Sequence, residues 1–183
     1  MKRIFSFICL LILTGCNQQK GSDGRFALSE FNNVEPIAVI EAEKYEIPVY
    51  DFNRFEKIWE EKNDKIYVVN FWATWCKPCV KELPAFEKLY RKYKRDDVEV
   101  ILVSLDFPKK VDEVLVPFLE EKDFKRNVML LDDPKQNTWI PKVDANWSGA
   151  IPATIIFNKN KRLFYEKSFT FKELEKELQG FLN

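Results

Sequence analysis

The five residues from Trp75 to Cys79, Trp-Cys-Lys-Pro-Cys, constrain the fold more than any other feature of the chain. They follow an apolar run at 66–72 and precede a charged segment with apolar residues at helical spacing. The two thiols are therefore expected at the carboxyl end of a buried strand, on the first turn of a helix. Backbone N–H groups there lack intrahelical partners and favour negative charge, so a cysteine ionises more readily. Because two cysteines three residues apart on one turn can also close into a disulfide and reopen, the arrangement predicts a redox site.

Length and composition exclude several other classes of protein. At 183 residues the chain is long enough for one well-filled domain, and a hydrophobic content of 46% indicates a globular core. Net charge is zero, which gives no reason to expect a nucleic-acid partner. The sequence contains no histidine. That absence excludes most metal sites, the usual hydrolase triads and any imidazole base.

The N-terminus has the pattern of a targeting segment. Met1-Lys2-Arg3 is a short positive region, and the apolar stretch at 4–13 is the size of a signal-peptide core rather than of a membrane span. It ends in Leu13-Thr14-Gly15-Cys16, which resembles the lipobox of bacterial lipoproteins. The resemblance implies cleavage after residue 15 and lipidation of Cys16. An ordinary secretory signal followed by a coincidental cysteine is the alternative.

Processing of this kind changes the cysteine count. Of the four cysteines, Cys9 would be removed with residues 1–15 and Cys16 would carry lipid, which leaves Cys76 and Cys79 in the folded part. A single pair is not the framework of a disulfide-stapled scaffold.

The mature chain is expected to consist of a tether and one domain. Residues 16–36 are polar, with clustered glycines, and are expected to form a flexible tether. The folded domain is expected at 37–183.

The domain shows alternating strand and helix patterns. Pro48 argues that the strand at 47–50 is an edge strand, because proline cannot donate a ladder hydrogen bond. Strands are expected at 37–40, 47–50, 66–72, 98–104, 128–131, 153–157 and 162–167, and helices at 53–62, 76–94, 111–119 and 171–182. This order predicts an α/β fold in which a mixed sheet is covered by helices on both faces. Trp139 and Trp147 are expected in the core beneath a long loop, with a substrate groove as the alternative.

Two separated motifs carry a resemblance to a known family. They are the segment 71–79 followed by Glu82-Leu83-Pro84, and the segment Gly149-Ala150-Ile151-Pro152-Ala153-Thr154. Together they resemble the thioredoxin superfamily, and more narrowly the membrane-tethered TlpA/ResA type of thiol–disulfide oxidoreductase. The resemblance implies a thioredoxin-like three-layer fold with an N-terminal extension. It also implies an extra βα insertion between the CxxC helix and a cis-proline loop at Pro152.

The motifs assign roles to individual residues. Cys76, nearest the helix N-terminus, is expected to be the nucleophile, and Cys79 the resolving thiol. The resemblance implies that Glu82 is a buried carboxylate that handles the proton of Cys79; a surface glutamate is the alternative. Ordinary thioredoxins carry a buried aspartate where this chain has Asn70, which leaves Glu82 as the carboxylate for proton transfer.

Other residues are expected to contact partners. Trp75, Lys77 and Ile151 are candidate contacts for a client protein, and a plain solvated residue is the alternative for Lys77. The implied partners are protein disulfide or dithiol clients such as apocytochromes, an upstream membrane thiol donor or acceptor, and membrane lipid through Cys16. We expect a monomer in the bacterial cell envelope, facing the periplasm or the outer surface, with no cofactor and no metal.

The CxxC motif leaves other functions to compare. A zinc half-site lacks further cysteine or histidine ligands, and a haem attachment site needs histidine where Val80 stands. A thiol peroxidase of the peroxiredoxin type is one alternative, although that class places threonine at the position of Ala73. A non-catalytic lipoprotein with a thioredoxin shell is the other alternative.

Overall fold

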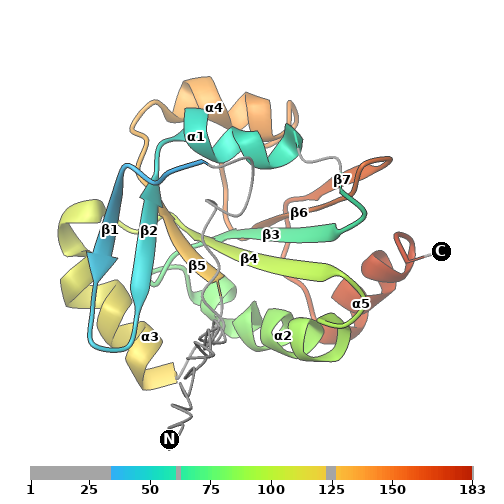
Figure 1. Cartoon of the computed structure of the whole chain (residues 1–183), viewed down its shortest axis with the longest axis horizontal. Coiled ribbons are helices and arrows are strands. Elements are labelled where there is room, and N and C mark those ends of the chain that lie inside the picture. The colour runs from blue at the N-terminus through green and yellow to red at the C-terminus, as the bar shows by residue number, and fades with distance from the viewer. Residues whose placement is uncertain (1–33, 61–62, 123–126, 183) are drawn as a thin grey trace, which may run out of the picture.

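A seven-stranded mixed sheet forms the centre of the molecule (Figure 1). The computed structural model describes residues 34–60, 63–122 and 127–182, so the signal segment, Cys16 and most of the tether lie outside the described residues. The strand order is β1-β2-β5-β4-β3-β6-β7. Strands β2, β5, β4 and β3 are mutually parallel, while β1, β6 and β7 are antiparallel to their neighbours. The strands are β1 (Ala38–Glu41), β2 (Glu46–Tyr50), β3 (Ile66–Trp72), β4 (Val98–Ser104), β5 (Asn127–Leu131), β6 (Ala153–Phe157) and β7 (Arg162–Tyr165).

Helices cover both faces of this sheet and give it the expected three layers. Helices α2, α3 and α5 lie on one face, and α1 and α4 lie on the other (Figure 1). Each face has its own apolar core, because successive residues of the buried strands point to opposite sides: Val68 packs in one core and Val69 in the other. The helices are α1 (Phe52–Phe55), α2 (Lys77–Tyr93), α3 (Val116–Lys122), α4 (Gln136–Val143) and α5 (Phe171–Gln179).

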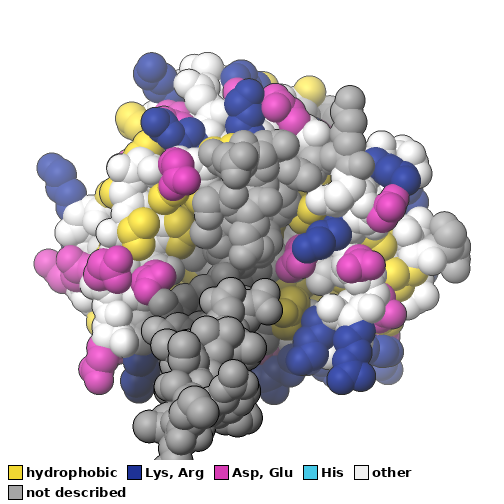
Figure 2. Space-filling model, viewed as in Figure 1, with side chains coloured by type: hydrophobic (Ala, Val, Ile, Leu, Met, Phe, Trp, Pro, Cys, Tyr) yellow, Lys and Arg dark blue, Asp and Glu magenta, His cyan; other side chains and the backbone are white. Residues whose placement is uncertain are grey.

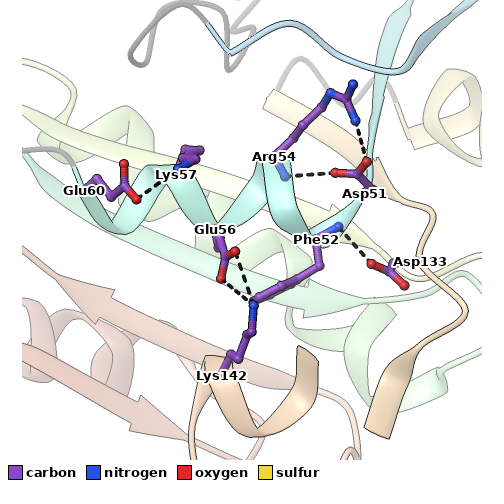
Figure 3. A network of polar contacts seen from close by, with 8 residues as sticks. All are labelled: Asp51, Phe52, Arg54, Glu56, Lys57, Glu60, Asp133 and Lys142. Atoms are coloured by element: carbon purple, nitrogen blue, oxygen red, sulfur yellow. Dashed lines mark hydrogen bonds and ion pairs between the residues drawn. The ribbon is translucent and has the colours of Figure 1, made fainter. Parts of the chain in front are cut away.

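Polar contacts attach α1 and the residue after it, Glu56, to the loop and helix that follow β5 (Figure 3). The backbone N–H of Phe52 donates to Asp133 Oδ2 at 3.2 Å, and Lys142 Nζ lies 3.1 Å from Glu56 Oε2. Phe52 also stacks on Trp139, with ring centroids 5.6 Å apart. Trp139 and Trp147 are 3% and 5% exposed, which confirms that both belong to the core.

The additional βα unit that the sequence predicts is present. Two units, β4 with α3 and β5 with α4, lie between α2 and β6 along the chain.

The position of β2 differs from the expectation. It is an internal strand, paired with β1 on one side and β5 on the other, so the assignment of 47–50 to an edge was wrong. Pro48 is tolerated because of where its nitrogen points. Val49 accepts from Ile37 N–H at 2.8 Å and so faces β1, which turns Pro48 toward β5. The ladder to β5 contains only Val49 and Tyr50, so no bond is lost at Pro48.

Two predicted helices are also irregular. Of the segment expected at 53–62, residues 61–62 lie outside the described residues, and the rest is one α-helical turn, α1, followed by a 3₁₀ segment at Glu56–Glu60. The segment expected at 111–119 begins with a π turn at Val111–Leu115, in which Val116 N–H donates to the carbonyl of Val111, before α3 starts. The wider turn keeps Val111 and Leu115 inside but leaves Val114 37% exposed.

The surface agrees with the near-neutral composition. On the face shown in Figure 2, acidic and basic side chains are interspersed among small apolar areas of the described residues. Within the three described ranges, no helix combines the length and the apolar character that a membrane crossing requires.

Candidate active site

The CxxC pair occupies the junction between β3 and α2, as the sequence predicts. All seven residues of β3 are buried, and the chain leaves the sheet at Trp72 to start α2 at Lys77. Cys76 is the N-cap: its Sγ accepts from the backbone N–H of Cys79 at 3.3 Å. Cys76 and Cys79 are joined in a disulfide. As whole residues, Cys76 is 6% exposed and Cys79 0%, so Cys76 is the more accessible of the two cysteines.

A proline loop lies directly beside the disulfide. The Ile151–Pro152 peptide bond is cis, as the resemblance implies, and the carbonyl oxygen of Ile151 lies 3.7 Å from Cys76 Sγ. The loop arrives there because β6 pairs antiparallel with β3, with Ala153 opposite Phe71. Trp147 precedes this loop, and its Nε1 donates to the carbonyl of Ala150 at 2.8 Å. The buried indole therefore holds the backbone in place just before Ile151.

Glu82 is buried behind the redox pair. It projects from α2 and is 3% exposed, so its interpretation as a surface glutamate is excluded. Its Oε1 accepts from Asn70 Nδ2 on β3 at 2.9 Å, and its Oε2 accepts from the backbone N–H of Phe169 at 2.7 Å. Thus the carboxyl group joins the CxxC helix to the central strand and to the segment before α5.

The environment of Glu82 raises its pKa. Burial is the main cause, because a carboxylate loses hydration inside the protein; the hydrogen bonds from Phe169 and Asn70 act in the opposite direction. The resulting pKa is about 7 instead of 4.5. A group with such a pKa can take up and release a proton near neutral pH, whereas a solvated surface carboxylate stays ionised there.

A second buried carboxylate, which the sequence reasoning missed, positions the loop before Cys76. Asp106 is 2% exposed and lies just after the carboxyl end of β4, beside the carboxyl end of β3. It accepts from Thr74 N–H at 3.1 Å, from Thr74 Oγ1 at 2.6 Å and from Ser104 Oγ at 2.8 Å. The sequence does contain a signal for Asp106. A Ser-x-Asp pattern at the end of a buried parallel strand places polar groups beside the carboxyl end of the neighbouring strand.

Two aromatic side chains are exposed next to these anchored segments. Trp75 is 59% exposed, as expected for a residue outside the core, whereas Trp72 is fully buried. Phe107, adjacent to Asp106, is 65% exposed and was not singled out from the sequence. Lys77 is exposed beside Cys76, and Ile151 is half-buried. The Thr74–Asp106 hydrogen bonds therefore hold the segments bearing Trp75 and Phe107 side by side.

At the site, the sulfur pair can exchange electrons, and the carboxyl group of Glu82 can exchange a proton near neutral pH. Among residues 34–60, 63–122 and 127–182, no three histidine, cysteine, aspartate or glutamate side chains gather in a way that could bind a metal ion.

A disulfide at the first turn of a helix, facing a cis-proline in a mixed sheet, defines a thioredoxin-like thiol–disulfide oxidoreductase. Comparison with known proteins agrees. The model of the AhpC/TSA family matches residues 41–166, and the chain belongs to this family. The matched range contains the CxxC motif, Glu82 and the proline loop.

Known relatives and solved structures of similar proteins support the same assignment. The thiol-disulfide oxidoreductase ResA of Bacillus anthracis is 27% identical over 179 residues, or 98% of this chain and 94% of that relative. ResA of Bacillus cereus strain ATCC 10987 is 33% identical over 126 residues, 67% of this chain and 65% of the relative. The solved structure of a putative thiol:disulfide interchange protein DsbE from Chlorobium tepidum has a TM-score of 0.55 and 21% identity, covering 80% of this chain and 93% of that one. At this identity the structural likeness concerns the fold alone.

Proposed function

We propose that the protein is a membrane-anchored thiol–disulfide oxidoreductase of the bacterial cell envelope that reduces disulfides in client proteins, of which apocytochromes are one class. The observation that carries the proposal is the combination of Cys76, the more accessible of the two cysteines, with a buried carboxyl group, Glu82, whose pKa is about 7. An upstream membrane thiol donor returns the pair to the dithiol form after each cycle.

The first step uses Cys76. As a thiolate, it attacks one sulfur of the client disulfide, so that a Cys76–client bond forms and the other client sulfur leaves as a thiolate, which takes a proton from solvent. The helix N-terminus supports the attacking thiolate, and the backbone N–H of Cys79 points at Cys76 Sγ. Pro152 places a residue without an N–H next to the sulfur, where the neighbouring backbone groups can pair with an extended client.

The second step uses Cys79 and Glu82. The Cys79 thiol gives its proton to the Glu82 carboxylate, and the resulting thiolate attacks Cys76 Sγ. The Cys76–Cys79 disulfide forms, the bond to the client breaks, and the client leaves as a second thiolate. In total two electrons pass from the protein to the client, and Glu82 later releases its proton.

The experiment that tests this function compares a protein disulfide with a peroxide as oxidant. We expect the dithiol form to reduce insulin disulfides and to turn over hydrogen peroxide no faster than a dithiol without the protein. The residue three before Cys76 is Ala73, fully buried, so no hydroxyl is present where a peroxiredoxin has threonine. Peroxide turnover without insulin reduction would establish the peroxidase alternative, and the absence of both would favour the non-catalytic one.

Trp75, Lys77 and Ile151 are proposed to contact the client. Because Trp75 is 59% exposed beside the nucleophile, we expect Trp75→Ala to raise the KM for insulin about tenfold, while the rate with a small disulfide such as glutathione disulfide stays the same. Val39→Ala is the matched control, since Val39 is 44% exposed on β1, at the far edge of the sheet. Equal effects of both variants on KM would show that Trp75 is not a client contact.

Anchoring through Cys16 is proposed from the lipobox pattern at 13–16. We expect Cys16→Ala to move the protein from the membrane fraction to the soluble fraction, because the thioether-linked lipid is then absent. Fractionation of cells followed by immunoblotting measures this. Retention of the variant in the membrane fraction would place the anchor elsewhere.

A further inference from the structure

Asn70 forms more contacts with hydrogen-bond acceptors than its amide can fully satisfy. It is completely buried on β3, on the face covered by α2. Its Nδ2 lies 2.9 Å from Glu82 Oε1, 3.1 Å from Thr154 Oγ1 and 3.4 Å from the carbonyl oxygen of Ala153. The Nδ2 group has only two hydrogens for these three acceptors, while Asn70 Oδ1 is buried without a hydrogen-bond partner among the described residues.

This orientation of the amide suits only one protonation state of Glu82. An ionised carboxylate accepts from Nδ2, and the hydrogen bond is then charge-assisted. A protonated Glu82 presents an O–H toward the same place, where Nδ2 has no lone pair to receive it. The unpartnered Oδ1 of the same amide, buried with the rest of the described core, is the acceptor that the protonated form requires.

A half-turn of the Asn70 amide about its χ2 angle exchanges Nδ2 and Oδ1. Oδ1 would then face the acid O–H of Glu82 and the hydroxyl of Thr154, and both can donate. Thr154 serves either orientation, because a hydroxyl is both donor and acceptor. The carbonyl of Ala153 favours the first orientation only, and its contact at 3.4 Å is the longest of the three.

We propose that Asn70 is a positioning residue whose amide reverses with the proton on Glu82, donating to the carboxylate and accepting from the acid. The proposal rests on the function proposed above, in which Glu82 takes the proton of Cys79. It gives a reason for asparagine at this place: an aspartate would oppose the ionised Glu82, and an apolar residue would serve neither form.

The groups that face Glu82 in the described part of the chain are uncharged. Its hydrogen-bond partners are Asn70 of β3 and the backbone of Phe169, and burial is the remaining influence on its ionisation. Thr154 of β6 completes the cluster and is uncharged. On α2 itself the nearby titratable group is the Cys79 thiol, which does not titrate in the disulfide form. The oxidised protein is therefore the form to measure.

Nuclear magnetic resonance of the oxidised protein tests the reversal directly. The Glu82 carboxyl carbon gives the titration midpoint, and the Asn70 side-chain amide protons give nuclear Overhauser contacts to Thr154. We expect these contacts to be present above the midpoint and lost below it, and to be independent of pH in Glu82→Gln. Contacts that persist on both sides of the Glu82 midpoint would overturn the proposal.

Thr154→Val gives a second test with a defined sign. The valine removes a contact in both orientations. Above the midpoint, Nδ2 still has two acceptors for its two hydrogens, Glu82 Oε1 and the carbonyl of Ala153, whereas in the reversed orientation Oδ1 loses a donor that nothing replaces. The acid form is disfavoured, and the Glu82 midpoint is expected to fall by about 0.7 pH unit, the equivalent of one ordinary hydrogen bond. A fixed amide predicts no decrease, so an unchanged or raised midpoint contradicts the reversal. If Glu82→Gln slows insulin reduction while the Asn70 contacts stay constant, only this inference fails.

Discussion

We expect Cys76→Ser to lose insulin reduction completely, with a decrease of more than about 10³-fold in the second-order rate constant. The serine hydroxyl does not ionise near neutral pH and cannot form a disulfide with a client. Cys79 cannot replace it, because the Cys79 residue is fully buried whereas Cys76 is 6% exposed. The measurement is the initial rate of insulin reduction by the pre-reduced proteins, with dithiothreitol removed before the assay.

Cys79→Ser is the matched control for that experiment. It keeps the nucleophile and the first step but lacks the thiol that releases the client, so we expect a stable mixed disulfide between Cys76 and insulin. The adduct should be visible as a mass increase that dithiothreitol removes. Wild-type rates in Cys76→Ser, or an adduct formed through residue 79 in that variant, would show that the order of the two cysteines is the reverse.

Local patterns in the sequence were enough to place the redox centre. The apolar run before Cys76 is β3, the periodic segment after Cys79 is α2, and both extend close to the predicted bounds. The helix expected at 171–182 is α5, which begins with a capping box between Thr170 and Glu173. In each case the residues that determine the structure lie within one or two turns of one another, where propensity and capping act.

Contacts between distant segments were not predictable in the same way. Pro48 suggested an edge strand, but the insertion of β5 beside β2 depends on pairing with residues about 80 positions later. Asp106 was missed because its partners, Thr74 foremost, belong to another strand–helix connection. The amide of Phe169, which holds one Glu82 oxygen, is 87 residues away in sequence. Local periodicity and capping contain no signal for such pairs.

The buried position of Glu82 has a consequence for catalysis. We expect Glu82→Gln to slow insulin reduction about 10²-fold at pH 8, because the amide cannot accept the proton of Cys79. In the wild type the rate should rise as pH increases through about 7, where Glu82 becomes ionised, and the variant should lack this inflection. The pH–rate profiles of both proteins measure the effect. An inflection near pH 7 that survives in the variant would assign the proton transfer to another group.

The same substitution, Glu82→Gln, should raise the stability of the folded protein at alkaline pH although it slows catalysis. The folded-state pKa of Glu82 is about 7, above the value of 4.5 for an unburied glutamate. Both states bind the proton below pH 4.5, so the folded protein is then at no disadvantage; between pH 4.5 and 7 only the folded state retains it, and stability falls as pH rises. At about 1.4 kcal/mol per pH unit, the loss reaches up to about 3 kcal/mol by about pH 8.

Glu82→Gln has no proton to lose, so in guanidinium unfolding of the oxidised proteins its stability should match the wild type at pH 4 and exceed it at pH 8. The measurement is the difference in the free energy of unfolding between the two proteins at each pH. A wild type that keeps the same stability difference from the variant at both pH values would mean that the pKa of Glu82 is the same in the folded and unfolded states. The buried carboxyl group could then not serve as the proton acceptor for Cys79, because its pKa would lie too far below that of a thiol.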